Sequence, residues 1–280
     1  MESCLHSYFI LNKEFVSSCD FKPEIFHRND NIYEVVRVMQ GHILFLDEHV
    51  QRLMQSAKNM GYNPSLQPEL IKKSLIKLVS LNRVDSGNIK VVLTEKKDDV
   101  PYAFAAWFIP HAYPDADMYE GGVSVSLLMM ERNRPNTKLQ NNAYKKEVSE
   151  HMKQEQVYEV LLTRNGEITE GSRSNVFFVK QNCIHTSPDH TVLKGITREK
   201  VLEICRKLEI PVKMEAVRTK NLGQFEACFL SGTSPKVLPV AEIKGLQRFQ
   251  PAHPLIKSIS KQYDIMLAEQ VGTNVHTKTV

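Results

Sequence analysis

Apolar runs of about four to eight residues recur along this chain, each bounded by turn-forming residues, and this length is typical of β-strands. In the first such pair, residues 32–38 and 42–46, Gln40 and Gly41 lie between two apolar runs and predict a hairpin turn. The runs fall into two groups, and each group is accompanied by helices. This organisation predicts an α+β fold. The other predicted strands are 7–11, 89–94, 102–109, 123–130, 157–163, 175–180, 212–217 and 227–230.

A few segments between the predicted strands have the apolar spacing of an α-helix. Apolar side chains recur at positions i, i+3, i+4 and i+7 from Val50 to Ala57, and Gly61 closes a helix that begins near residue 47. His49 and Arg52 lie off this apolar stripe, so we expect that packing does not require them. The other predicted helices are 68–81, 142–156 and a segment that begins near residue 197.

A predicted linker divides the chain into two parts. Residues 110–117 contain two prolines and two aspartates, a composition typical of loops. We therefore predict a smaller N-terminal α/β domain of residues 1–113 and a larger, β-rich C-terminal domain of residues 114–280. The tail, residues 270–280, is polar and is expected to fray.

Charge and cysteine content exclude several classes of partner. The 36 basic and 32 acidic residues are mixed along the chain, so we expect no nucleic-acid partner, which a clustered basic stripe would indicate. The five cysteines contain no Cys-x-x-Cys pair, which favours reduced thiols in the cytoplasm and no metal site. No uninterrupted apolar stretch of export-signal length occurs in residues 1–16, so we expect no export signal there, and no run approaches the ~18 apolar residues of a membrane span.

Three polar clusters border strands or helices and are candidates for chemistry. In 193–198 a glycine turn enters a helix whose amides and Thr197 hydroxyl can hold a phosphate, although Thr197 also fits a simple N-cap. Residues 231–235 place small hydroxyl donors after a strand, where a tight turn is the alternative. Glu170, within 167–175, precedes small polar residues and a strand, and a surface hairpin is its alternative.

Taken in order, these segments resemble the fold-type IV family of pyridoxal phosphate enzymes. The family includes D-amino-acid aminotransferases, branched-chain aminotransferases and aminodeoxychorismate lyases. The resemblance runs from about residue 25 to residue 240. The matching segments are Ile32-Tyr33-Glu34-Val35-Val36, His49-Val50-Gln51-Arg52-Leu53, Lys138, Thr169-Glu170-Gly171 with Asn175-Val176-Phe177, Gly195-Ile196-Thr197-Arg198, and Ser231-Gly232-Thr233.

The resemblance implies roles for individual residues toward pyridoxal 5'-phosphate. Lys138 would form the Schiff base with the cofactor aldehyde, which requires a deprotonated amine. Glu170 would pair with the pyridine nitrogen and keep it protonated, so that the ring accepts electrons. The other implied cofactor-binding residues are Arg52, Thr233 and Ser234 with the amides of Ile196 and Thr197 at the phosphate, Leu193 on the ring, and Gly195, Tyr33 and Asn141.

The chain departs from the family pattern where substrates are recognised. Family members usually have Gly-Asp-Gly behind an aromatic residue, whereas this chain has Arg28-Asn29-Asp30-Asn31. Arg28 is therefore a candidate to bind a substrate carboxylate bidentately, with a surface arginine as the alternative. Residues 95–102 lack both the Arg-x-His of D-amino-acid enzymes and the Arg-Gly-Tyr of lyases, and Lys97 is a candidate point charge there.

The activity implied by the resemblance is transfer of an amino group between an amino acid, of the D or the branched-chain type, and a 2-keto acid. Residues 33–36 look most like the D-amino-acid branch. Two alternatives stay open: an aminodeoxychorismate lyase of the folate pathway, which needs no keto acid acceptor, and a cofactor binder without turnover. The resemblance also implies a homodimer, with the cofactor at the interface of the two domains. Donor, acceptor and stereochemistry are not predicted.

Overall fold

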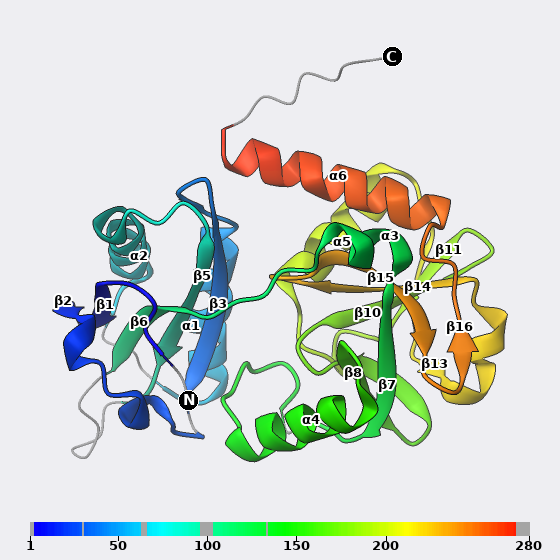
Figure 1. Cartoon of the computed structure of the whole chain (residues 1–280), viewed down its shortest axis with the longest axis horizontal. Helices are drawn as coiled ribbons and strands as arrows, with labels where there is room; N and C mark the ends of the chain where they lie inside the picture. Colours follow the sequence, from blue (N-terminus) through cyan, green and yellow to red (C-terminus); the bar gives the residue numbers. More distant parts are fainter. Residues whose placement is uncertain (1–2, 30, 63–65, 96–102, 133, 273–280) are drawn as a thin grey trace. The chain divides into compact units, whose positions relative to one another are not determined.

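The structure, a computed structural model, describes residues 3–29, 31–62, 66–95, 103–132 and 134–272. The chain forms two compact units (Figure 1). The first comprises Met1–Ala112, Thr137–Asn142 and Leu267–Val280, and the second comprises Tyr113–Asn136 and Ala143–Met266. Each unit contains a sheet with helices, so the predicted α+β fold is confirmed. The division at residue 113 into two domains stays a prediction.

The first unit is built on an antiparallel six-stranded sheet in the order β2-β1-β6-β5-β3-β4. Two helices, α1 (Leu46–Asn59) and α2 (Pro68–Asn82), pack on one face of this sheet through a shared apolar cluster. A second, aromatic cluster containing Phe26 and Trp107 covers the opposite face. The strands are β1 (Tyr8–Leu11), β2 (Glu14–Ser17), β3 (Ile32–Met39), β4 (His42–Ile43), β5 (Gly87–Leu93) and β6 (Phe104–Ile109).

A segment distant in sequence completes the edge of this sheet. β4 pairs with β3 only at Val38 and Met39, which leaves the beginning of β3 without a partner strand on that side. Residues 137–142 lie there: Leu139 forms an antiparallel bridge with Ile32, and Tyr33 N donates to Lys138 O at 3.0 Å. These backbone contacts are the reason that Lys138 belongs to the first compact unit.

The second unit contains a ten-stranded sheet in the order β12-β11-β10-β14-β15-β7-β8-β9-β13, with β16 against β15. The pairs β7–β8, β7–β15 and β11–β12 are parallel, and the others are antiparallel. The strands are β7 (Val123–Met129), β8 (Glu159–Arg164), β9 (Glu167–Gly171), β10 (Asn175–Lys180), β11 (Cys183–Thr186), β12 (Val212–Met214), β13 (Val217–Arg218), β14 (Ala227–Gly232), β15 (Lys236–Ile243) and β16 (Gln247–Arg248).

The remaining helices are α3 (Ala116–Gly121), α4 (Asn142–Glu155), α5 (Ile196–Lys207) and α6 (Pro254–Gln270). The segment predicted as a linker ends in α3, because Asp115 Oδ1 caps that helix by accepting from Met118 N at 2.9 Å. The sequence reasoning missed α6, although Ile256, Ile259, Tyr263 and Leu267 are buried at helical spacing. Residues 273–280 of the predicted frayed tail lie outside the described residues. Within the described ranges, no helix combines the length and apolar character that crossing a bilayer requires.

Candidate active site

Lys138 lies against the first residues of β3. Its side chain is 14% exposed, and its Nζ lies 3.6 Å from Glu34 Oε2 and 5.4 Å from the centroid of the Tyr33 ring. Lys138 N also lies 3.5 Å from Ser56 Oγ of α1, within hydrogen-bonding distance. Backbone and side chain are thus both held by the first unit, which fixes the position of the amine.

Glu34 is a buried charge on the helix-covered face of β3. Because side chains alternate along a strand, Glu34 points to the same face as Ile32 and Val36, toward α1. Arg52 of α1 donates to both carboxylate oxygens, through Nε to Oε1 at 2.6 Å and through Nη2 to Oε2 at 2.7 Å. His49 Nδ1 lies 2.8 Å from Oε2 and must carry the hydrogen, since a carboxylate only accepts.

The charges around Glu34 decide its ionisation. Burial alone would raise the pKa of the Glu34 carboxyl, but the positive charges of Arg52 and Lys138 and the hydrogen bonds from His49 and Arg52 hold it well below its ordinary value. Burial also lowers the pKa of His49, despite the opposing influence of Glu34. The lysine cluster, defined as Glu34, His49, Arg52 and Lys138, therefore holds an ionised carboxylate beside the Arg52 guanidinium, the His49 imidazole and the Lys138 amine.

The expectation that His49 lies away from the buried side of its helix is wrong. His49 is 3% exposed, and it is buried because Glu34 needs hydrogen-bond donors there. The signal in the sequence was an acid at a core position of β3, between Ile32 and Val36. A carboxylate in an apolar alternation predicts a buried partner, and His49 and Arg52 supply it.

A second buried lysine lies on the opposite face of the same sheet and was missed by the sequence reasoning. Lys90 of β5 is 3% exposed, and its Nζ donates to Gln140 Oε1 at 2.9 Å. The amine also lies 5.2 Å from the centroid of the Trp107 ring. Gln140 in turn donates to Phe26 O at 3.1 Å, so this network anchors the segment that carries Lys138. A lysine inside the apolar run of β5 was the available signal.

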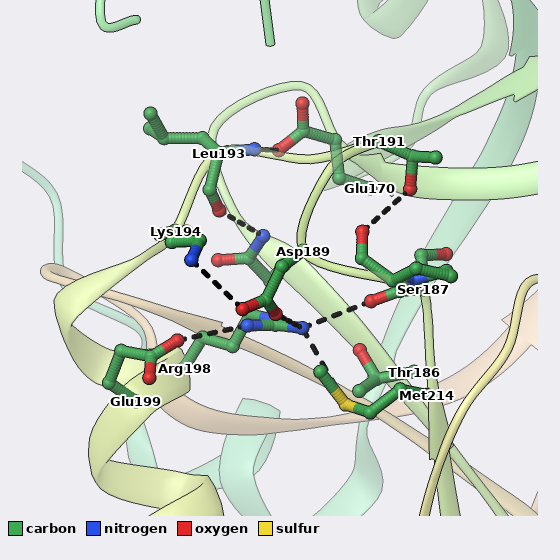
Figure 2. Close-up of polar contacts among 12 residues, drawn as sticks. Glu170, Thr186, Ser187, Asp189, Thr191, Leu193, Lys194, Arg198, Glu199 and Met214 are labelled. Carbon is green, nitrogen blue, oxygen red and sulfur yellow. Dashed lines mark hydrogen bonds and ion pairs between the residues drawn. The ribbon is translucent and has the colours of Figure 1, made fainter. Parts of the chain in front are cut away.

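Glu170 of β9 is the buried carboxylate of the second unit. It is 2% exposed, so the alternative of a surface hairpin is excluded. Leu193 N donates to Glu170 Oε2 at 3.1 Å, and Arg132 Nε lies 3.3 Å from Glu170 Oε1 (the Leu193 contact is drawn in Figure 2). One oxygen of this carboxylate thus accepts a backbone hydrogen bond, and the other is in an ion-pair contact.

Arg132, which the sequence reasoning missed, is itself held by two further contacts. Its Nη2 donates to Ser172 O, and its guanidinium lies 5.3 Å from the centroid of the Tyr144 ring. Tyr144 Oη donates to the same carbonyl at 3.0 Å. Burial raises the pKa of Tyr144 to about 12, so this hydroxyl stays protonated at neutral pH. We call Glu170, Arg132 and Tyr144 the carboxylate cluster.

The beginning of α5 has the geometry of an anion site. Gly195 is the N-cap residue and makes no side-chain cap, so the first amides of the helix have no intrahelical acceptor. A Cβ at Gly195 would lie 2.2 Å from Asn175 Oδ1, so a larger residue would force the Asn175 side chain to move. Thr197 is the second residue of the helix, and its Oγ1 lies 3.4 Å from Tyr263 Oη. The alternative that Thr197 is the N-cap is therefore wrong.

The loop that carries Leu193 is pinned from the helix side by Arg198 (Figure 2). Arg198 is fully buried; its Nη2 donates to Ser187 O at 3.0 Å and lies 2.9 Å from Asp189 Oδ1. Lys194 Nζ pairs with the other oxygen of Asp189 at 3.0 Å. Asn175 Nδ2 donates to Leu193 O at 2.9 Å from the sheet side. Leu193, whose amide reaches Glu170, is thus fixed at both its nitrogen and its carbonyl.

The structure groups the predicted residues by unit. Lys138, Tyr33 and Arg52 come together in the first unit, which also contains the half-buried Arg28 and the exposed Asn141. Glu170, Leu193 and the beginning of α5 come together in the second, whereas Thr233 and Ser234 follow the end of β14. Lys97 lies outside the described residues. In the described part of the chain, no cluster of His, Cys, Asp or Glu suits a metal ion.

Comparisons with known proteins identify the family of this chain. The profile of the amino-transferase class IV family matches residues 31–243. A D-alanine aminotransferase of Bacillus licheniformis is 31% identical over 81% of this chain and 83% of its own length. A solved branched-chain amino acid aminotransferase of Escherichia coli shares the fold, with a TM-score of 0.82 and 23% identity over 98% of this chain and 97% of that one. A branched-chain aminotransferase of Thermoproteus uzoniensis, solved with norvaline, has a TM-score of 0.82 and 21% identity over 96% of each chain. Because the profile match spans well over half of the sequence, the chain belongs to the class IV aminotransferase family.

Proposed function

We propose that this chain is a pyridoxal 5'-phosphate-dependent aminotransferase, which moves an amino group between an amino acid and a 2-keto acid. The observation that carries the proposal is Lys138: the lysine that matches the family motif is also a largely buried amine, held against β3 and beside Glu34. Most lysines are solvated, and a buried amine in a fixed position is the arrangement that covalent amine chemistry needs.

The residues present fit this cofactor. Glu170 is held by Leu193 N on one oxygen and Arg132 on the other, and a carboxylate has about four lone-pair directions, so it can also accept a ring N–H. The beginning of α5 offers uncapped amides beside Gly195, where a larger residue would clash with Asn175. Ser231 Oγ is buried and has no hydrogen-bond partner among the described residues. When bound, pyridoxal phosphate supplies an aldehyde that links to amines and a ring that accepts electrons from the substrate Cα.

The roles of the chain's own residues follow from their chemistry. We assign to Lys138 the covalent attachment and the movement of the proton at the substrate Cα. Glu34 stabilises the ammonium form of Lys138 when the lysine holds a proton, because their charges are opposite and both groups are shielded from water. Glu170 would place negative charge at the ring nitrogen of the bound cofactor, and Leu193 would pack on its ring. The residues that would hold the phosphate are Arg52, Thr233 and Ser234, with the amides of Ile196 and Thr197.

Assembly and location are part of the same proposal. We propose that the protein is a homodimer in the cytoplasm. Support comes from the family resemblance and from the five cysteines, all of which are free thiols. Sedimentation of the purified protein tests the dimer: a fully active monomer would contradict it.

D-Alanine is the first donor that we propose. The support is the D-alanine aminotransferase of Bacillus licheniformis and the D-amino-acid character of residues 33–36. Branched-chain amino acids are the second choice, after the names of the structural neighbours. Arg28 stays our candidate for the substrate carboxylate, since no Arg-x-His pair exists in residues 95–102, and Lys97 stays a secondary candidate.

The absorbance spectrum tests the proposal directly. Purified protein with pyridoxal phosphate is expected to show the band of a lysine-linked cofactor, and D-alanine should convert this band to that of the amine form. L-Alanine, L-glutamate and L-leucine are added separately, and Lys138→Ala serves as the control without a band. Pyruvate release with no keto acid acceptor would indicate a lyase instead. A wild-type protein with no band would contradict the proposal.

A further inference from the structure

The carboxylate that we assign to the ring nitrogen has a cation beside it. Glu170 Oε2 is fixed by Leu193 N at 3.1 Å, while Arg132 Nε lies 3.3 Å from Oε1. We propose, on the basis of the proposed function, that Arg132 is a positioning residue, which orients Glu170 toward the ring nitrogen and sets the positive charge of the cofactor site. Nothing in the motif set of the family resemblance includes Arg132.

The contact geometry allows both the pair and a ligand. An ionised carboxylate offers about four lone-pair directions, and Leu193 N and Arg132 Nε approach it from different oxygens. The Arg132 contact, at 3.3 Å, is also longer than the two contacts of 2.6 and 2.7 Å that Arg52 makes with Glu34. A further N–H donor can therefore approach Glu170 without displacing Arg132.

The guanidinium is held in place by groups other than Glu170. Arg132 Nη2 donates to Ser172 O, and the guanidinium lies over the Tyr144 ring, 5.3 Å from its centroid. Tyr144 Oη donates to the same carbonyl at 3.0 Å. The side chain of Arg132 is 17% exposed and that of Glu170 is 3% exposed, so water screens their interaction only weakly. Arg132 is thus a fixed charge and not a mobile counter-ion.

A fixed cation at this position has two consequences of opposite kind. It favours the ionised form of Glu170, which keeps the carboxylate an acceptor for the ring N–H. It also disfavours any other positive charge nearby, because like charges repel. A protonated group of a cofactor bound at Glu170 should therefore lose its proton at lower pH than it would without Arg132.

The test is a pH titration of the absorbance of the cofactor-loaded protein. Arg132→Met is expected to raise the pKa read from this absorbance by roughly one unit. Arg132→Lys keeps the charge, so its pKa should stay near that of the wild type. Arg164→Met is the matched control, because Arg164 forms an exposed pair with Glu131 in the same unit, and its pKa should not change.

The outcomes separate this inference from the proposed function. A wild type without a titrating band would overturn the proposed function itself. A normal wild-type titration with an unchanged pKa in Arg132→Met would overturn only the role of Arg132. If Arg132→Met does not fold, Arg132→Gln removes the same charge and keeps a donor for Ser172 O, and the same upward shift is expected. An unchanged pKa in that variant would equally reject the inference.

Discussion

Glu34 and Glu170 are both buried carboxylates with an arginine beside them, yet the arginines hold them differently. Arg52 contacts both oxygens of Glu34 at 2.6 and 2.7 Å, and His49 and Lys138 add further contacts to Oε2. Glu170 has a backbone N–H on one oxygen and the looser contact of Arg132 on the other. The same residue pair thus forms a closed network in the first unit and a more open one in the second.

The difference indicates how each carboxylate is used. A carboxylate whose oxygens are both occupied by charged donors acts as a fixed counter-charge, and we assign Glu34 that role toward Lys138. A carboxylate in a more open network can accept a ligand's hydrogen, and we assign Glu170 that role. Changes at Glu34 should therefore affect mainly stability, whereas changes at Glu170 should affect mainly turnover.

The largest expected effect comes from opening the closed network. Arg52→Met leaves Glu34 buried with its strongest partner removed, and loss of one member of a buried pair costs about 3–5 kcal/mol. Urea unfolding of the cofactor-loaded protein measures this change. Arg164→Met, which breaks an exposed pair, should cost about 0–1 kcal/mol. Equal losses in the two variants would show that the network is not closed in solution.

At Glu170 the comparison predicts a loss of rate instead. Glu170→Gln keeps the shape but removes the negative charge at the ring nitrogen, and loss of one such electrostatic partner lowers kcat by about 10²–10³-fold. Steady-state kinetics with D-alanine measures this, and urea unfolding should show a smaller change than in Arg52→Met. If kcat stays within a few-fold of the wild type, Glu170 does not act on the ring.

The sequence predicted the elements better than the contacts between them. Alternation and helical spacing located β3, α1 and α5, because these patterns are local. The pairing of Leu139 with Ile32 joins segments that are far apart in the chain, and no local pattern contains that information. Lys138 was therefore identified from its motif, whereas its burial beside Glu34 could be seen only in the structure.

The missed residues show the same limit. Glu34 and Lys90 were visible as charges inside apolar strands, so their burial was predictable, while their partners His49 and Gln140 were not. Arg132 belongs to no recognised motif, and only its contact with Glu170 makes it a candidate functional residue. α6 was missed although its apolar spacing is local, so that error was avoidable.

A smaller effect is expected when Glu34 in the closed network loses its charge, either by substitution or at low pH. The pKa of Glu34 lies below its ordinary value of 4.5, so its ionised form stabilises the folded state; this contribution is complete above the unfolded pKa and disappears as pH falls through the folded pKa. Glu34→Gln should therefore lose about 1.5–3 kcal/mol at neutral pH. Urea unfolding is measured at a series of pH values from 7 downward. The difference in unfolding free energy between the wild type and Glu34→Gln should decrease below about pH 4.5. If this difference in unfolding free energy does not change with pH, the charge of Glu34 does not stabilise the fold.

The smallest effect is expected from a variant that removes a contact holding Arg132 in place but keeps the positive charge of Arg132. Tyr144→Phe removes the hydrogen bonds of the hydroxyl to Ser172 O and to Arg132 but keeps the ring under the guanidinium. Arg132 therefore retains its charge and its contacts with Ser172 O and Glu170. We expect a loss of about 0.5–1.5 kcal/mol in stability. The absorbance pKa of the loaded protein should not move, because no charge near Glu170 has changed. A shift in that pKa as large as the one expected for Arg132→Met would instead place the phenol, and not the guanidinium, in control of the cofactor's charge.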